Sequence, residues 1–213
     1  MSQKADRTRE NILKTARKHF LKDGLDAASL RSIVKDAGVT TGAFYKYFPT
    51  KDSLFDALVD PYVEHVYQIY DAILEDFVEL SAEEQTDNMT KSSNDGIHKI
   101  IDYVYDHYDH FRLLMKCGDS GKYADFIHNM VKREVNSTLD YMAVLKSSGI
   151  EIPEMDESLL HMIATGFFSG VFQIIEHDID KDVAKRNISQ LKEFQTGGWE
   201  RVLKIKFPEN EQL

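Results

Sequence analysis

Apolar residues recur along nearly the whole chain at the spacing of an α-helix. In the first such stretch, residues 6–23, the side chains of Ile12, Ala16 and Phe20 are spaced one helical turn apart. Gly24 follows at the point where a helix would end. Further helical patterns cover residues 29–37, 40–48, 50–80, 95–107, 108–117, 121–147, 156–178 and 181–206. Since no alternating stretch of useful length predicts a strand, the sequence favours an all-α fold.

Polar or glycine-containing breaks separate these patterns. The stretch SAEEQTDNMTKSSND, residues 81–95, is polar and aperiodic, so we predict a loop there. The chain then divides into a small part with three helices, which we place at residues 1–50, and a larger helical part, residues 51–213. We therefore expect two domains.

The third helix is unusually short. Gly42 lies in its first turn, although a glycine inside a helix is about 1 kcal/mol less favourable than an alanine. Pro49 then ends the helix. Two short helices joined by a few residues that include a glycine, here Gly38, are typical of a helix-turn-helix. In that motif the second helix enters the major groove of DNA. The pattern therefore predicts a DNA-binding domain at the N-terminus.

Charge is distributed unevenly along the chain. The net charge of −10 by itself argues against a nucleic-acid partner. Residues 1–51, however, contain eleven lysines and arginines against five acids, a net +6, which leaves −16 for the remaining 162 residues. A chance clustering on a solvated surface would give the same numbers, so the charge supports the DNA-binding interpretation without deciding it.

Other function classes lack their sequence signals. There is no P-loop, no Rossmann glycine pattern, no Gly-x-Ser-x-Gly and no Glu-x-x-His, so we expect neither an enzyme nor a cofactor. His107 and His110 have helical spacing but no second cluster of ligands, and we expect no metal. A single cysteine, Cys117, no signal peptide and no run of 18 apolar residues favour a cytoplasmic protein.

Residues 9–58 resemble the DNA-binding domain of the TetR family of transcriptional regulators. The resemblance is carried by four motifs, which are Gly38-Val39, Thr41-Gly42, Tyr45 with Phe48, and Lys51-Asp52-Ser53-Leu54. It implies a three-helix helix-turn-helix domain followed by a C-terminal helical bundle for ligand binding and dimerisation.

The resemblance also implies which residues meet DNA. Phe44 and Phe48 correspond to core positions, while the expected DNA-binding residues are Ser29, Arg31, Thr40, Thr41, Gly42, Tyr45, Lys46, Tyr47 and Lys51. Ser29 and Thr40 are also good helix caps, and Tyr45 could serve mainly in packing. At Lys46 and Tyr47 the family more often has an aromatic residue and a histidine, so the bases that this helix reads stay open.

The family forms dimers through its C-terminal domain, and residues 156–178 fit that role. This segment is apolar nearly all round, which predicts burial on every side. With residues 181–206 it would form a four-helix interface about a two-fold axis. The expected interface residues are Gly166, Phe168, Gly170, Phe172, Phe194 and Trp199. Packing within one chain would explain the same pattern.

The family's C-terminal domain often encloses a ligand pocket. Aromatic residues and methionines of this region could line one, and the candidates are Tyr62, Tyr103, Phe111, Met115, Tyr123, Phe126, Met130 and Phe167. Each of them could equally be a core residue. We thus expect a homodimeric repressor that a small-molecule effector releases from a palindromic operator in double-stranded DNA. The alternatives are an activator or a regulator controlled by a protein partner and, more remotely, an all-α enzyme or carrier.

Overall fold

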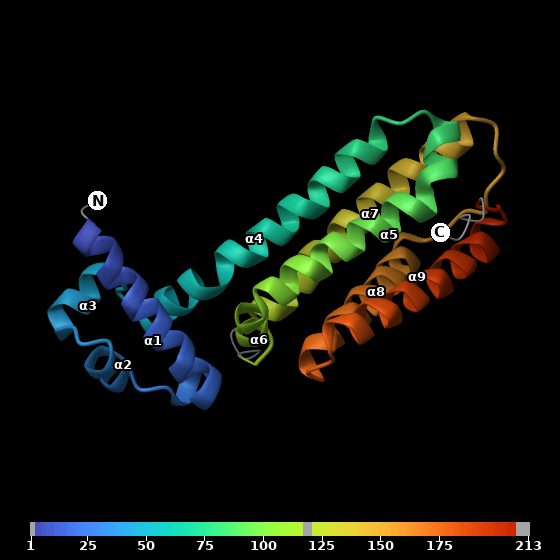
Figure 1. The fold of residues 1–213 in the computed structure, drawn as a ribbon. Coiled ribbons are helices and arrows are strands. Elements are labelled where there is room, and N and C mark those ends of the chain that lie inside the picture. The colour runs from blue at the N-terminus through green and yellow to red at the C-terminus, as the bar shows by residue number, and fades with distance from the viewer. Residues whose placement is uncertain (1–2, 117–120, 208–213) are drawn as a thin grey trace. The chain divides into compact units, whose positions relative to one another are not determined.

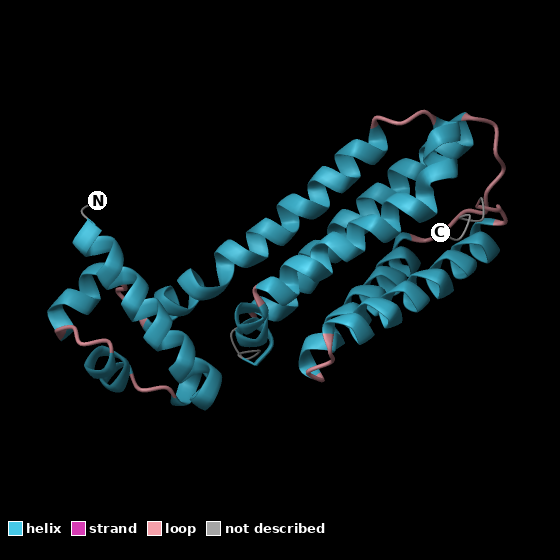
Figure 2. Cartoon of the chain, viewed as in Figure 1, coloured by secondary structure: helices cyan, strands magenta, loops and turns pink. Residues whose placement is uncertain are grey.

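The computed structural model describes residues 3–116 and 121–207, and within these ranges the chain forms helices and no strand (Figures 1 and 2). Cys117 lies outside the described residues. The helices are α1 (Gln3–Ala27), α2 (Leu30–Asp36), α3 (Thr41–Tyr47), α4 (Lys51–Val78), α5 (Ala82–Asp106), α6 (Tyr108–Lys116), α7 (Lys122–Ser147), α8 (Glu157–Glu176) and α9 (Lys181–Leu203). The predicted all-α fold is confirmed.

The chain packs into two compact units. The N-terminal unit comprises residues 1–65 and 107–123, and the C-terminal unit comprises residues 66–106 and 124–213. Helix α4 begins in the first unit and ends in the second, whereas α6 belongs to the N-terminal unit. The domain boundary after residue 50 stays a prediction.

A single apolar core holds the N-terminal unit together. Helix α1 packs on both α2 and α6, and α2 packs on α3. The backbone of α1 leaves the helical conformation at Gly24 (φ 80°, ψ 169°), which is where the sequence predicts its end. Phe20 of α1 meets Phe55 of α4 edge to face, with the ring centroids 6.0 Å apart. The first three helices are thus fixed against α4 and α6.

His110 is a buried polar residue at the contact of α1, α4 and α6. Its Nδ1 lies 2.7 Å from the carbonyl oxygen of Leu58, and its Nε2 lies 3.1 Å from Arg17 Nη1. The ring also stacks on Tyr62 at a centroid distance of 3.7 Å. Since a carbonyl and a guanidinium occupy the two ring nitrogens, the neutral tautomer with hydrogen on Nδ1 fits this site. Both ring nitrogens and one face of the His110 ring are thus in contact with groups of the same unit.

The C-terminal unit is a bundle whose core combines aliphatic side chains with several aromatic ones. Phe126 of α7 meets Phe172 of α8 edge to face at 4.8 Å, and Tyr70 of α4 meets Phe168 in the same way at 5.8 Å. Helices α8 and α9 pack on each other and run side by side (Figure 1). A Cβ at Gly170 would lie 3.7 Å from Leu191, so this glycine faces α9 within the same chain.

Helix α5 begins much earlier than the sequence pattern predicts. The loop expected at residues 81–95 is wrong, because α5 starts at Ala82. A reciprocal cap starts the helix: the backbone N–H and the hydroxyl of Ser81 lie 2.9 and 2.7 Å from Glu84 Oε2, and the Glu84 N–H lies 3.3 Å from Ser81 Oγ. This Ser-x-x-Glu capping box is visible in the sequence and outweighs the lack of apolar periodicity.

Helix α8 is long and apolar enough to cross a membrane by length and composition. In the structure, however, much of it is buried against the rest of the unit. The buried residues are Leu160, Ala164, Phe167, Phe168, Val171, Phe172, Ile174 and Ile175. Burial inside a helical bundle accounts for its apolar character.

Candidate functional site

The turn between α2 and α3 has a fixed geometry. Gly38 adopts a positive φ of 65°, which an L-amino acid with a side chain rarely takes. Its N–H lies 3.1 Å from the Lys35 carbonyl oxygen, and the Val39 N–H lies 3.2 Å from that of Val34. These two hydrogen bonds form a Schellman motif, which ends α2 and satisfies its last carbonyls. From α1, the Asn11 amide also donates to the Ala37 carbonyl at 2.7 Å.

Two hydroxyl residues begin the paired helices. Ser29 Oγ accepts the N–H of Ser32 at 3.4 Å, and Thr40 Oγ1 accepts the N–H of Ala43 at 3.2 Å. Both residues have extended backbones, as N-caps do. The capping role that the sequence allows for them is confirmed. Both are also exposed, so their outer surfaces are accessible to a partner.

Helix α3 has a buried face and an exposed face. Phe44 is completely buried and lies 6.1 Å from the ring of Phe48, over which the Arg9 guanidinium sits at 5.7 Å. These contacts confirm both phenylalanines as core residues. Tyr45, by contrast, is 49% exposed, although one side of its ring meets Phe44 at 5.4 Å. The exposed residues of α3 are Thr41, Gly42, Tyr45 and Lys46, and Tyr47 is half-buried.

Lys51 has a structural role at the start of α4. Its ammonium donates to the carbonyl oxygen of Asp26 at 2.8 Å and lies 3.4 Å from that of Ala28. Thr50 and Ser53 cap the same helix end reciprocally, with backbone-to-hydroxyl distances of 3.1 and 2.9 Å. Lysine has three donors, so one more can reach a phosphate beside this helix N-terminus. Arg31 on α2 is exposed.

The C-terminal unit contains a cavity of about 120 Å³ inside the bundle. It is lined by residues of five helices and of the segment after α9, which are Tyr70, Ile73, Leu74, Phe77, Gly96, Ile97, Glu134, Ser137, Thr138, Tyr141, Phe167, Phe168, Lys192, Thr196, Trp199, Leu203 and Phe207. The lining residues of α4, α7 and α9 each recur at three- or four-residue spacing, so each helix contributes one face. Such a mostly apolar cavity with a few polar groups is typical of small-molecule sites.

Polar groups of the cavity lie on three of these helices. The hydroxyl of Tyr70 donates a hydrogen bond to Glu134 Oε2. Burial, reinforced by this carboxylate, raises the pKa of Tyr70 well above its usual value, so the tyrosine stays a donor. The ammonium of Lys192 lies 5.3 Å from the centroid of the Phe167 ring. Burial lowers the pKa of Lys192, and Glu134 partly opposes this effect.

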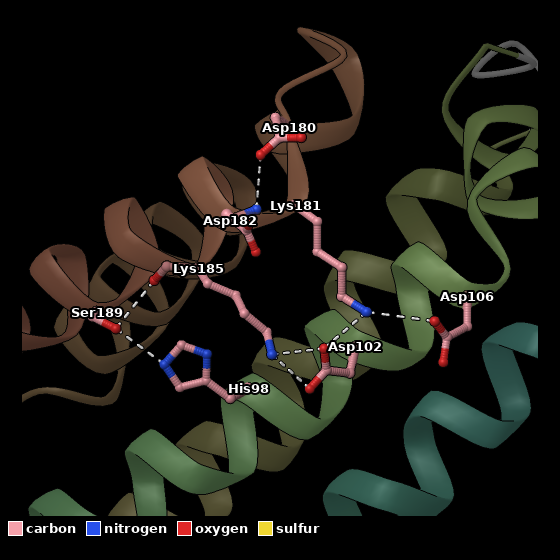
Figure 3. Close-up of polar contacts among 8 residues, drawn as sticks. All are labelled: His98, Asp102, Asp106, Asp180, Lys181, Asp182, Lys185 and Ser189. Carbon is pink, nitrogen blue, oxygen red and sulfur yellow. Dashed lines mark hydrogen bonds and ion pairs between the residues drawn. The ribbon is translucent and has the colours of Figure 1, made fainter.

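An ion-pair network fixes α9 against α5 (Figure 3). Asp102 Oδ1 lies 2.7 Å from Lys185 Nζ and 3.0 Å from Lys181 Nζ, and Lys181 also reaches Asp106 at 3.4 Å. One turn away, His98 Nε2 lies 3.0 Å from Ser189 Oγ. The two lysines lower the pKa of Asp102. Because these groups are still partly exposed to solvent, their main effect is on the register of the two helices.

The comparison with known families settles the class of the N-terminal helices. Residues 12–58 match the family model described as "Bacterial regulatory proteins, tetR family". Residues 12–58 therefore form a TetR-family DNA-binding domain. The match includes the whole helix-turn-helix and the start of α4.

Curated relatives match this chain in the same region. The regulator AcrR of Shigella flexneri is 43% identical over 56 residues, which are 26% of this chain and 26% of AcrR. The repressor NicS of Pseudomonas putida is 39% identical over 66 residues, or 31% of this chain and 29% of NicS. The uncharacterised regulator YvdT of Bacillus subtilis is 41% identical over 56 residues, or 26% of this chain and 29% of YvdT. The chain thus spans less than a third of the length of each of these relatives.

Solved structures extend the likeness to the fold of nearly the whole chain. A TerR/AcrR-family regulator from Aquifex aeolicus aligns with a TM-score of 0.60 over 88% of this chain and 99% of its own, at 16% identity. The TetR-family regulator PfmR from Thermus thermophilus aligns with a TM-score of 0.59 over 92% and 99%, at 15% identity. At such low identity these matches establish the TetR-regulator fold, including its helical C-terminal domain.

The ligand-binding residues expected from the sequence are distributed over both units, and among them only Phe167 lines the cavity. Tyr62, Phe111, Met115 and Tyr123 belong to the N-terminal unit. Tyr103, Phe126 and Met130 belong to the C-terminal unit, but its cavity is lined by other residues. Three further lining residues, Tyr70, Glu134 and Lys192, were not expected from the sequence. Each is a polar residue at a position where the helical periodicity predicts burial, and that conflict is the sequence signal that could have identified them.

The residues expected at a dimer interface also differ in their surroundings. Phe168 and Phe172 are buried inside the chain, and Trp199 lines the cavity. Gly166 is exposed with no atom near its missing side chain. Phe194 is 76% exposed. The last two are therefore the members of this set that a partner could contact.

Proposed function

We propose that this protein is a homodimeric transcriptional repressor that binds a palindromic operator through α3 and is released by a small-molecule effector. The observation that supports it most directly is the exposed face of α3, held by a Schellman turn and by a buried Phe44. A rigid support is what a two-turn helix needs if it is to fit the major groove in one orientation. Such a protein works in the cytoplasm, where the DNA is, and is not an enzyme.

The roles of the exposed side chains follow from their chemistry. Thr41 and Gly42 begin α3 and let its backbone approach the DNA closely, while Tyr45, Lys46 and Tyr47 offer hydroxyl and ammonium donors. Arg31, Lys51 and the caps Ser29 and Thr40 would contact phosphates near helix N-termini.

Dimerisation would use the outer face of α8 and α9. Phe194 and Met162 are 76% and 70% exposed, which is unusual for large apolar side chains, and Gly166 lies on the same face of α8 as Met162. Two copies packed by this face would form a four-helix interface. A palindromic site requires that the two α3 helices of such a dimer lie about 34–36 Å apart.

Release by an effector would act through α4. This helix carries Tyr70 and Phe77 at the cavity and begins with Lys51 beside the DNA-binding helices. A ligand that binds the cavity better in the conformation with low operator affinity would shift the population toward that conformation. An activator, or a regulator that responds to a protein partner, would use the same DNA-binding surface.

A mobility-shift titration tests the proposal. The full chain should prefer a palindrome from its own promoter region over a scrambled duplex of equal length, and the affinity should fall steeply as salt is raised. Lys46→Ala should weaken operator binding, whereas Lys99→Ala, which removes the same charge from an exposed site on α5, should not. Equal affinity for both duplexes would refute the reading as a sequence-specific regulator.

Gly42→Ala gives a sharper test of the groove assignment. A Cβ at this position would meet no atom of the protein, and alanine favours a helix over glycine by about 1 kcal/mol. The substitution should therefore preserve or raise stability and still lower operator affinity, because the added methyl group would face the DNA. Unchanged affinity in the stable variant would remove Gly42 from the interface.

A further inference from the structure

The cavity of the C-terminal unit contains two opposite charges that compensate each other. Its lining includes one cation, Lys192, and one carboxylate, Glu134. Glu134 raises the pKa of Lys192 against the larger, lowering effect of burial, so the lysine lies in the field of the carboxylate. The charged residues of the lining therefore sum to zero.

Both charges also have partners within the chain. Tyr70 donates a hydrogen bond to Glu134 Oε2. The Lys192 ammonium lies 5.3 Å from the centroid of the Phe167 ring and has a further interaction within the chain. A charged ligand would have to replace these contacts or enter the bundle without a counter-ion, and its lost hydration would then cost several kcal/mol. The cavity thus favours an uncharged ligand.

Hydroxyl groups of the lining can bind the polar end of such a ligand. The Tyr70 hydroxyl already donates to Glu134, and the Tyr141 hydroxyl lies 3.2 Å from that of Thr86. Within the described part of the chain, no hydrogen bond is found for the side-chain hydroxyls of the other such lining residues, Ser137, Thr138 and Thr196. Since a hydroxyl both donates and accepts, these three can pair with a hydroxyl or a carbonyl group.

The size of the cavity limits the apolar part of the ligand. Its volume is about 120 Å³, close to the roughly 150 Å³ of an engineered protein cavity that binds benzene. Aromatic side chains line it from several helices, including Phe77, Tyr141, Phe167 and Trp199. Edge and face contacts with these rings favour a flat ligand with one ring.

We infer that the cavity binds a small uncharged aromatic molecule with one hydroxyl or carbonyl group, which pairs with the hydroxyls of Ser137, Thr138 and Thr196. This inference rests on the proposed function in taking the cavity as the effector site, and it adds the class of the ligand. The compensated pair of Glu134 and Lys192 excludes ionised molecules of the same size.

The chain contains a natural reporter for this binding. Trp199 is its only tryptophan and lines the cavity, so its fluorescence reports directly on ligands there. Titration of the full chain with benzyl alcohol, benzoate and benzylamine compares a neutral molecule, an anion and a cation of similar size. Benzyl alcohol should bind about tenfold or more tightly than either ion, because each ion loses its hydration without gaining a counter-ion.

Removal of the hydroxyls separates the polar contact from the apolar ones. A variant that combines Ser137→Ala, Thr138→Val and Thr196→Val nearly keeps the shape of the lining. It should lower benzyl alcohol affinity about fivefold, the worth of one neutral hydrogen bond, and leave toluene affinity nearly unchanged. Thr165→Val, at an exposed position of α8, should change neither affinity. Retained toluene binding also shows that the combined variant is folded, and the three single variants serve if it is not.

Three results would overturn the inference: benzoate or benzylamine binding as tightly as benzyl alcohol, no binding of benzyl alcohol, or unchanged benzyl alcohol affinity without the three hydroxyls. These measurements need no DNA, so they fail or succeed separately from the proposed regulator function. Palindrome binding without benzyl alcohol binding would reject the ligand class alone. Benzyl alcohol binding without palindrome binding would reject the regulator and keep the cavity site.

Discussion

The two units differ in how far apart along the chain their interacting residues lie. In the N-terminal unit the Ser29 and Thr40 caps and the turn at Gly38, which shape the recognition helices, use contacts over three to five positions. In the C-terminal unit the bond from Tyr70 to Glu134 spans 64 positions and that from Lys185 to Asp102 spans 83.

This difference explains why the helix-turn-helix could be predicted from the sequence and the residues that line the cavity could not. A turn and two caps leave a short, recognisable pattern, and known relatives match in that region. A cavity is built from single faces of helices that are distant in sequence. Those faces resemble ordinary core until the helices are packed together.

The largest effect should follow from emptying the core under α3. Phe44→Ala removes a fully buried ring and should destabilise the N-terminal unit by about 3–5 kcal/mol, with loss of operator binding. Tyr45→Ala, at the exposed neighbour, should cost about 1 kcal/mol or less. Urea unfolding followed by circular dichroism measures both. Similar losses for the two variants would contradict the division of α3 into a buried and an exposed face.

A smaller loss should follow from adding volume in the C-terminal unit. A Cβ at buried Gly96 of α5 would lie 2.9 Å from Ile73 Cδ1 of α4, so Gly96→Val should destabilise the chain by about 1–3 kcal/mol. Gly166→Val adds the same side chain at an open position of α8 and should be nearly neutral. Thermal unfolding at low protein concentration, where self-association does not contribute, compares them. An equal loss in both variants would mean that close approach of α4 and α5 is not the cause.

The turn before α3 should be sensitive to backbone conformation. Gly38→Ala places a side chain at a positive φ and should cost about 1–2 kcal/mol, although no atom obstructs the new methyl group. Gly42→Ala makes the same change at an open helical position and should not destabilise. Chemical denaturation of the two variants side by side tests this contrast, which would fail if Gly38→Ala were as stable as the parent.

The smallest effect concerns pH. Burial lowers the pKa of His110, with the Leu58 carbonyl partly opposing it, and burial lowers the pKa of His98 as well. The unfolded chain then binds protons more tightly than the folded one. The stability contributed by the neutral rings is therefore complete above a pH of about 6.5 and is lost as the pH falls below it.

The urea midpoint should accordingly decrease between about pH 7.5 and pH 5.5. His110→Gln should reduce this pH dependence, with His98 retaining part of it, whereas His128→Gln, at an exposed position of α7, should leave it as it is. A pH dependence in His110→Gln identical to that of the parent would exclude His110 as a source.

The sequence predicts the all-α class, the break at Gly24, the caps Ser29 and Thr40, and the buried pair Phe44 and Phe48. Each follows from a local rule of capping, chain reversal or periodicity. The prediction failed at residues 81–95, where apolar periodicity was weighed above the Ser81–Glu84 capping box. The ligand contacts expected from residue type stay predictions, because aromatic residues of a helical bundle are buried whether or not they meet a cavity.

The N-terminal unit is discontinuous in sequence, because it needs residues 107–123 as well as residues 1–65. During synthesis, Phe20 and Phe55 can meet early, but Arg17 and Leu58 gain their partner His110 only after α6 has left the ribosome. The DNA-binding surface therefore reaches its final support only after α6 (Tyr108–Lys116) has been made. A nascent chain that stops before α6 would contain the whole recognition helix α3 but would lack the contacts that α6 makes with α1 and α4.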